Sequence, residues 1–256
     1  LDLFGRVRSL KQQSLQTFLA TEADQYSTKI SLIAEVASAY YTLAADQALL
    51  ALAQQTFSAQ QDTLKLTQRK LEIGVENQLT VSQQQTLVEE ARADTANYTA
   101  QVAIDKSALA LLIGGEVSPA LLPPAITAFP KVALDLPAGL PSDMLTRRPD
   151  IMSAEHSLLA ANANIGAARA AFFPKIALTA TAGTSSTDLA RLFMGGTGVW
   201  SFIPSITIPI FNWGSNSANL NIARVERDIT VSTYEKTIQT AFKEVSDGLV
   251  KATGLR

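Results

Sequence analysis

Residues 36–71 read VASAYYTLAADQALLALAQQTFSAQQDTLKLTQRKL and contain neither Gly nor Pro, the residues that interrupt helices most strongly. The stretch without either residue is longer still and runs from about residue 8 to 73. Every seventh residue within it is large and apolar: Val36, Leu43, Leu50, Phe57, Leu64 and Leu71. A sustained heptad column of this kind predicts a coiled-coil helix. At about 1.5 Å per residue the helix would be roughly 98 Å long, more than the diameter of a compact domain.

Two further columns of the same helix differ in chemistry. One is mostly glutamine and indicates a face toward solvent or a water-filled interior: Tyr40, Gln47, Gln54, Gln61 and Gln68. The other is mostly small and permits close approach of another helix: Ile30, Ala37, Ala44, Ala51 and Ser58. Three distinct stripes predict neighbours on more than one side of the helix.

The chain then turns back. Gly74 is suited to cap the first helix at its C-terminus, and Thr80 is expected to cap a second helix that ends near residue 113, before Gly114. Residues 1–113 are therefore predicted to form an antiparallel helical hairpin with its tip at residues 74–79. A soluble helical bundle or a spectrin-like rod would explain this half of the sequence equally well.

Residues 114–150 hold seven of the ten prolines, which excludes long helices from most of this connector. An apolar face of helical period follows at residues 151–171. The period then falls to two over residues 176–182 and 200–210, which predicts a β-hairpin within residues 172–212 and a connecting loop at residues 183–199. A second long helix is expected over residues 213–256.

The two predicted strands separate their side chains into an apolar face and a small, hydroxylated face. A hairpin packed on a helix and a pair of membrane-barrel strands both fit this alternation. The membrane interpretation is favoured because the apolar face is continuous and large. Pro204 and Pro209 also count against a place inside an ordinary sheet.

Composition excludes several classes of function. Charged residues are 17% of the chain and the net charge is −2, so there is no general electrostatic attraction to nucleic acid. With no Cys and one His, the chain has no disulfide, zinc–thiolate site or cluster of histidines. No run reaches the roughly 18 apolar residues of a membrane-spanning helix. We find no catalytic residue, cofactor site or metal site.

The candidates for chemistry are His156 and the pair of Arg148 and Asp150. His156 follows Glu155 on a predicted helix, where adjacent side chains do not face each other, so it is interpreted as a structural histidine. Arg148 and Asp150 are interpreted as a structural ion pair beside a turn. An enzyme is therefore the least favoured class.

The sequence also repeats itself. Leu3-Phe4 corresponds to Ile210-Phe211 and Glu35-Val36 to Glu244-Val245, at offsets of 207 and 209 residues. A strand end followed by a long helix thus occurs twice, which is typical of a duplicated unit. Neither end resembles a natural terminus, and we expect the chain to be a piece of a longer protein.

With these elements in place, the chain resembles the outer-membrane channel components of tripartite efflux pumps along essentially its whole length. Within that TolC superfamily it is similar to the OprM-like, NodT-like lipoprotein branch of resistance-nodulation-division (RND) systems. The resemblance rests on motifs that occur in order: residues 1–6, 140–143, 147–151, 154–155, 165–174, 209–211, 234–235 and 244–245.

The resemblance implies a mainly α fold, in which long antiparallel coiled-coil helices build a periplasmic α-barrel and strands build an outer-membrane β-barrel. It implies a homotrimer that contacts outer-membrane lipid, a periplasmic adaptor and an inner-membrane RND pump, and that passively conducts drugs or other toxic compounds to the exterior. No cofactor is implied.

The resemblance also assigns roles to residues. The adaptor would dock on the tip formed by Gly74, Val75, Glu76, Asn77, Gln78 and Leu79. A structural motif at the equator of the α-barrel would comprise Arg147, Arg148, Asp150 and Glu155. The lumen-facing strand residues would be Thr179, Thr181, Ser205 and Thr207. The lipid-facing ones would be Ile176, Leu178, Trp200, Phe202, Ile206 and Ile208.

The chain departs from the family pattern in three ways. It holds two of four expected strands, it lacks the lipidated N-terminal Cys, and it lacks the second helical tip, so gate residues are not assigned. The alternative function is a periplasmic helical adaptor or scaffold without a membrane span, which leaves the alternating strands unexplained. A pore-forming toxin is a weaker alternative.

Overall fold

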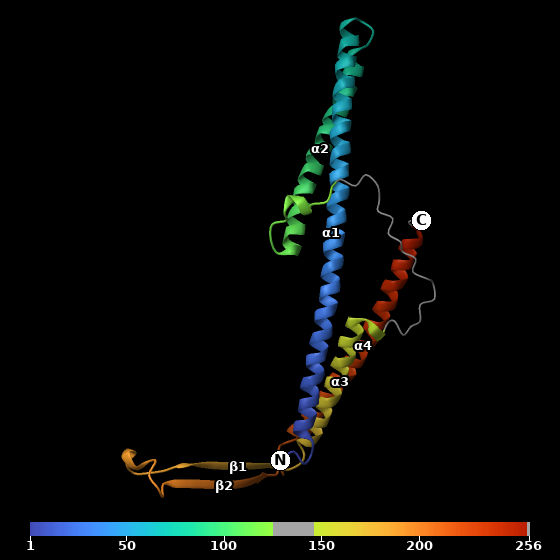
Figure 1. Ribbon diagram of the computed structural model, residues 1–256. Helices are drawn as coiled ribbons and strands as arrows, with labels where there is room; N and C mark the ends of the chain where they lie inside the picture. The colour runs from blue at the N-terminus through green and yellow to red at the C-terminus, as the bar shows by residue number, and fades with distance from the viewer. Residues whose placement is uncertain (125–145, 255–256) are drawn as a thin grey trace. The chain divides into compact units, whose positions relative to one another are not determined.

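The computed structural model describes residues 1–124 and 146–254 (Figure 1). The chain divides into two compact units, one made of residues 28–135 and the other of residues 1–27 and 136–256. Helix α1 (Arg6–Glu72) contributes its first part to the second of these units and the rest to the first.

The unit of residues 28–135 is an antiparallel helical hairpin. Helix α2 (Gln78–Ile113) runs back beside α1 (Figure 1). Leu43 of α1 and Val102 and Leu109 of α2 form its buried core. The partly buried side chains around this core are Val36, Ala39, Tyr40, Leu50, Val117 and Leu122. The predicted heptad column of α1 therefore provides the apolar seam of the hairpin, as the spacing indicated.

The other two stripes of α1 are less covered. Gln54 and Gln68 are exposed, and the rest of the glutamine column is half-buried. Of the small column, Ala44 is buried and the other members are exposed. The two helices are also joined by a hydrogen bond, in which Gln84 Nε2 donates to Gln60 Oε1 at 2.6 Å. Whether a further helix packs on the small stripe stays a prediction.

The other unit contains the start of α1, helix α3 (Pro149–Ala170), a β-hairpin and helix α4 (Ser215–Gly254). Small buried residues let these helices approach closely: Ala20, Ala23, Ala160, Ala167, Ala170, Ala223 and Ala241. Gly166 of α3 shows how tight the contact is, because a Cβ there would lie 2.7 Å from Ser9 Oγ of α1. Asn216 Nδ2 of α4 donates to the carbonyl of Ala171 at 2.9 Å, so the end of α3 is tied to the start of α4.

A short 3₁₀ helix, η1 (Pro119–Leu121), follows α2, and another, η3 (Leu189–Arg191), lies in the loop of the β-hairpin. Most of the proline-rich connector, including the motif at residues 140–143, lies outside the described residues. Within the part of the chain that the structure describes, no helix has both the length and the apolar character needed to cross a membrane.

Strands β1 (Lys175–Thr184) and β2 (Gly198–Thr207) pair antiparallel over their full lengths. The predicted end of the second strand at residue 210 is wrong, and Ile208 lies outside the ladder. The last pair is Lys175 with Thr207. Pro174 precedes that pair on one side and Pro209 follows on the other, and neither has an N–H to extend the ladder.

The connecting loop is shorter than predicted. Gly183 pairs with Val199 and Thr184 with Gly198, so the ladder continues into residues that the composition assigned to the loop. The amide of Ser185 then donates to the carbonyl of Thr197 at 2.9 Å. Glycine and threonine are common in loops, but here they extend the strands because their backbone groups find partners in register.

Candidate functional site

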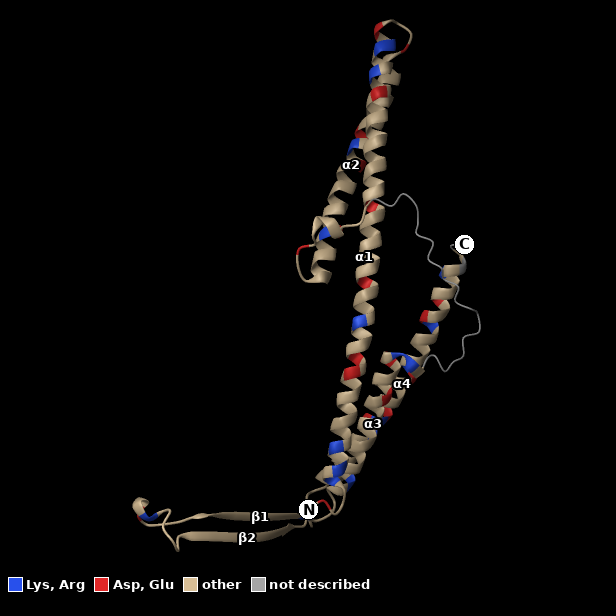
Figure 2. Cartoon of the chain, viewed as in Figure 1, with Lys and Arg blue, Asp and Glu red and all other residues tan. Residues whose placement is uncertain are grey.

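The β-hairpin presents one large apolar face. Cross-strand partners place side chains on the same side of a sheet. The pairs on this face are Ile176–Ile206, Leu178–Pro204, Ala180–Phe202 and Ala182–Trp200. Trp200 is 81% exposed and Phe202 56%. Apart from Lys175 at the start of β1, both strands are free of charged side chains (Figure 2).

The opposite face is smaller and more polar. Its central pairs are Ala177–Ser205, Thr179–Ile203 and Thr181–Ser201. The hydroxyls of Thr181 and Ser201 are hydrogen-bonded at 2.6 Å, and Ser205 Oγ donates to the carbonyl of Ala177 at 3.5 Å. The register thus brings the two predicted sets of strand residues onto opposite faces, except for Ile208. In this chain both faces are open.

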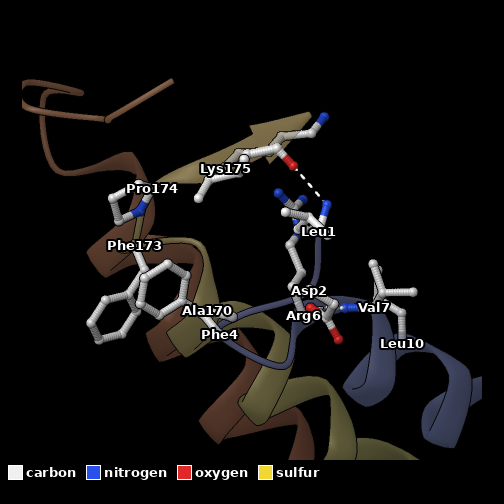
Figure 3. A pocket seen from close by; sticks show the side chains of 11 residues that line it. Leu1, Asp2, Phe4, Arg6, Val7, Leu10, Ala170, Phe173, Pro174 and Lys175 are labelled. Atoms are coloured by element: carbon white, nitrogen blue, oxygen red, sulfur yellow. Dashed lines mark hydrogen bonds between the residues drawn. The ribbon is translucent and has the colours of Figure 1, made fainter. Parts of the chain in front are cut away.

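The junction between strand and helix is held by specific contacts (Figure 3). The ring of Phe4 stacks on Phe173 with 4.7 Å between centroids, and the backbone nitrogen of Leu1 donates to the carbonyl of Ile176 at 2.8 Å. Asp2 caps α1 by accepting from the amides of Arg8 at 2.9 Å and Val7 at 3.0 Å. The amide of Arg8, with that of Val7 and the charge of Arg8, holds the pKa of Asp2 below its ordinary value.

A cavity of about 550 Å³ opens at this junction. Its walls include Phe4, Phe173 and Pro174, which are apolar, and Arg6 and Lys175 (Figure 3). Sequence reasoning used residues 1–6 and 165–174 only as motifs and did not foresee that they meet. Their spacing of about 170 residues gives no local signal of contact.

The tip of the helical hairpin is closed by its own backbone. Gly74 has φ +76°, a left-handed conformation that suits glycine. Its amide donates to the carbonyl of Leu71 at 2.9 Å, and the amide of Val75 donates to the carbonyl of Lys70 at 2.9 Å. These two bonds form a Schellman motif, which satisfies the last carbonyls of α1.

Helix α2 is capped by Asn77, so the expectation that Thr80 caps it is wrong. Asn77 has an extended backbone, and its Oδ1 accepts from the amide of Thr80 at 3.0 Å and from the Thr80 hydroxyl at 3.2 Å. Thr80 is the third residue of α2 and donates to Asn77 instead of capping the helix. Asparagine ranks above threonine as an N-cap, which the sequence could have indicated.

The tip exposes apolar side chains on this rigid backbone. Ile73, Val75 and Leu79 are 68%, 68% and 66% exposed. Glu76 is half-buried, and Gln78 begins α2. Because the backbone hydrogen-bonding groups at the end of α1 and the start of α2 already have partners, the exposed apolar side chains of the tip are free to contact another molecule while the backbone keeps its conformation.

Arg148 ties the start of α3 to α4. Its Nε and Nη2 donate to the two carboxylate oxygens of Asp150 at 3.0 and 2.7 Å, and Nη2 also reaches Glu244 Oε2 at 2.6 Å. The hydrogen bonds that Arg148 donates to Asp150 raise the pKa of Arg148 further above its already high value and lower the pKa of Asp150. The predicted Arg148–Asp150 pair is present.

The other members of the equatorial set lie outside this cluster. Arg147 and Glu155 are exposed. Glu244, which entered the sequence analysis only as part of the repeat and of a family motif, is the partner that was not predicted. His156 Nδ1 lies 2.6 Å from Oε1 of the buried Gln16, in agreement with a structural role. Among residues 1–124 and 146–254 no group of three or more His, Cys, Asp or Glu side chains could hold a metal.

Comparison with known proteins identifies the family. The model of the outer membrane efflux protein family matches residues 1–115 and 140–256. The chain belongs to the outer membrane efflux protein family. This membership confirms the resemblance and the outer-membrane location that the sequence implied.

Members of the outer membrane efflux protein family in Pseudomonas putida are similar to the chain. The toluene efflux pump outer membrane protein TtgC and the antibiotic efflux pump outer membrane protein ArpC are each 53% identical over 249 residues. The match covers 97% of this chain and 51% of each relative. The chain therefore spans about half the length of the curated relatives it matches.

A solved structure of the family has the same fold. The open state of the MtrE outer membrane channel of Neisseria gonorrhoeae matches with a TM-score of 0.85 and 41% identity. The match covers 100% of this chain and 57% of that channel. This confirms the fold class, mainly helical with a paired strand unit.

Proposed function

We propose that the chain is part of a passive outer-membrane exit duct of a tripartite efflux system, which conducts drugs or other small toxic compounds to the exterior. The observation that carries this proposal is the β-hairpin, in which one uncharged apolar face and one hydroxylated face are fixed in register. Family membership supports it. The duct performs no reaction of its own.

The two faces have different surroundings in this proposal. The side chains that contact lipid are Ile176, Leu178, Trp200, Phe202 and Ile206. The lumen is lined by Thr179, Thr181, Ser205 and Thr207. The glutamine stripe of α1 faces water in the same way. A homotrimer supplies the further strands that close the barrel, since open strand edges are not tolerated in lipid.

Cargo is chosen elsewhere in the pump. Two relatives of equal identity to this chain are named for different compounds, toluene and antibiotics. A conduit lined by uncharged hydroxyl and amide groups has little means of selecting between such compounds. This supports passive conduction by the duct and selection by an inner-membrane RND pump.

The tip of residues 74–79 is the proposed docking site of a periplasmic adaptor. Its exposed apolar side chains lie on a backbone fixed by the Schellman motif and the Asn77 cap. The Arg148 cluster has a different role, because its groups bond to each other. It fastens α3 to α4, and Arg147 and Glu155 are exposed outside it.

Replacing Val75 with Asp should weaken adaptor docking and efflux together. Val75 is 68% exposed and its side chain supports no described contact of the fold, so the change removes apolar contact area and adds a charge to the interface. We expect at least about tenfold less cross-linking to the adaptor, a loss of about 1.4 kcal/mol, and a matching rise in ethidium accumulation in cells.

Val75→Ile is the matched control and should keep both adaptor cross-linking and efflux. The trimer band on native gels should be unchanged in both variants. Normal cross-linking and efflux in the Asp variant would refute the docking role of the tip. A lost trimer band would show instead that the tip is needed for assembly.

A further inference from the structure

Two carboxyl side chains meet inside the helical hairpin. Asp46 lies on α1, three residues after the fully buried Leu43, and Asp105 lies on α2, three residues after the buried Val102. Asp105 is only 8% exposed. The side chains of Asp46 and Asp105 are within hydrogen-bonding reach of each other. Asp46 is half-buried. An acidic pair between two helices requires an explanation, because like charges close to each other repel.

If Asp46 and Asp105 are both ionised, one oxygen of Asp105 has no hydrogen-bond donor among the described residues. Gln101 Nε2 donates to Asp105 Oδ1 at 2.8 Å. Asp105 Oδ2 is buried and has no donor among the described residues when Asp46 is a carboxylate. An ionised carboxylate only accepts hydrogen bonds, whereas a protonated one donates. A proton on Asp46 therefore supplies the missing donor.

Among the described residues, no positive charge acts on Asp46. Burial, followed by the hydrogen bond and the negative charge of Asp105, raises the pKa of Asp46. Lys106 on α2 and Glu116 after it are exposed, and neither contributes to this effect. On α1, α2 and the described segment that follows them, Asp105 is the charged group that acts on Asp46.

We propose that Asp46 and Asp105 form a proton-binding pair that fastens α1 to α2 in acid and releases this part of the hairpin as the pH rises. One proton lies between Asp46 and Asp105 Oδ2, while Gln101 holds Asp105 Oδ1. The inference concerns the helical hairpin alone, so it stands or falls separately from the proposed function.

The direction of the pH effect follows from the raised pKa. An acid that binds its proton more tightly in the folded state stabilises that state at low pH. The stabilisation is complete below the ordinary value of 3.8 and is lost as the pH rises through the higher pKa of Asp46 in the folded chain. The hairpin should therefore be better protected at pH 5 than at pH 8.

Hydrogen exchange in the intact protein tests the pair. Amide protection within residues 40–50 and 101–109, corrected for intrinsic exchange rates, should be lower at pH 8 than at pH 5. In Asp46→Asn the amide donates permanently to Asp105, so protection should be equal at both pH values. Asp94→Asn, at an exposed position on α2, should behave as the unmodified protein.

Three results would overturn the proposal. One is equal protection of the unmodified protein at both pH values. Another is protection lost even at pH 5 in both Asp46→Asn and Asp105→Asn, since each variant supplies a donor to the remaining carboxylate. The third is protection at pH 8 that Ca²⁺ or Mg²⁺ restores and a chelator removes, which would make the pair a cation site.

Discussion

Replacing Arg148 with Ala is expected to destabilise the packing of α3 on α4 by about 2 kcal/mol, because hydrogen bonds to charged groups each contribute about 1.5–3 kcal/mol. The side chain of Arg148 is 29% exposed, and it neutralises Asp150 and Glu244 together. Without it the two carboxylates stand near each other without a cation. Urea unfolding of the intact protein, followed by hydrogen exchange in α3 and α4, measures the loss.

Arg147 provides a matched control one residue away. It is exposed and outside the cluster, so Arg147→Ala should change stability by no more than about 0.5 kcal/mol. Arg148→Lys should recover only part of the loss, because an ammonium cannot form the two parallel bonds to Asp150. Equal losses in Arg147→Ala and Arg148→Ala would show that the cluster does not fasten the helices.

The same cluster predicts a dependence on acid. Arg148 lowers the pKa of Asp150 in the folded chain. A carboxyl that loses its proton more readily when folded stabilises the fold above its ordinary value of 3.8 and stops doing so as the pH falls through the lower folded value. The stability difference between the unmodified protein and Arg148→Ala should therefore shrink below about pH 4.

Replacing Phe202 with Lys is expected to block membrane assembly. Phe202 lies near the middle of β2 on the apolar face, opposite Ala180. A lysine on the lipid face of a barrel near the bilayer midplane costs about 2–4 kcal/mol. In a homotrimer the change occurs three times, so the penalty per assembly is about 6–12 kcal/mol. The measurement is the yield of heat-resistant trimer in outer-membrane fractions.

Thr179→Lys is the matched control for Phe202→Lys. Thr179 lies one residue pair away from Phe202 in the ladder but on the hydroxylated face, where a charge stays in water. It should assemble to nearly normal yield. Similar yields of the two variants would contradict the assignment of the faces.

The helical hairpin could be predicted from the sequence because its signal is periodic and long. The heptad column that includes Leu43 and Leu50 packs in the seam, and Gly74 ends α1 where it was expected. The strand faces were likewise predicted, because alternation fixes which side chains share a side once the register is set.

The misses are of two kinds. Local ones, such as the cap at Asn77 and the end of β2 at Thr207, depended on which of several neighbouring groups finds a partner. Distant ones could not be read from spacing at all. Arg148 and Glu244 are 96 residues apart, and Asp46 meets Asp105 only because the hairpin closes in one register.

A cysteine scan of β2 tests the function most directly. Single cysteines at residues 199–207 of the intact protein, in outer-membrane vesicles, would be labelled with a charged maleimide that cannot enter lipid. We expect labelling to alternate with a period of two, with reaction at Ser201, Ser205 and Thr207 and protection at Trp200, Phe202 and Ile206. Uniform labelling of both sets would contradict a membrane duct, because both faces of the β-hairpin would then be exposed to water.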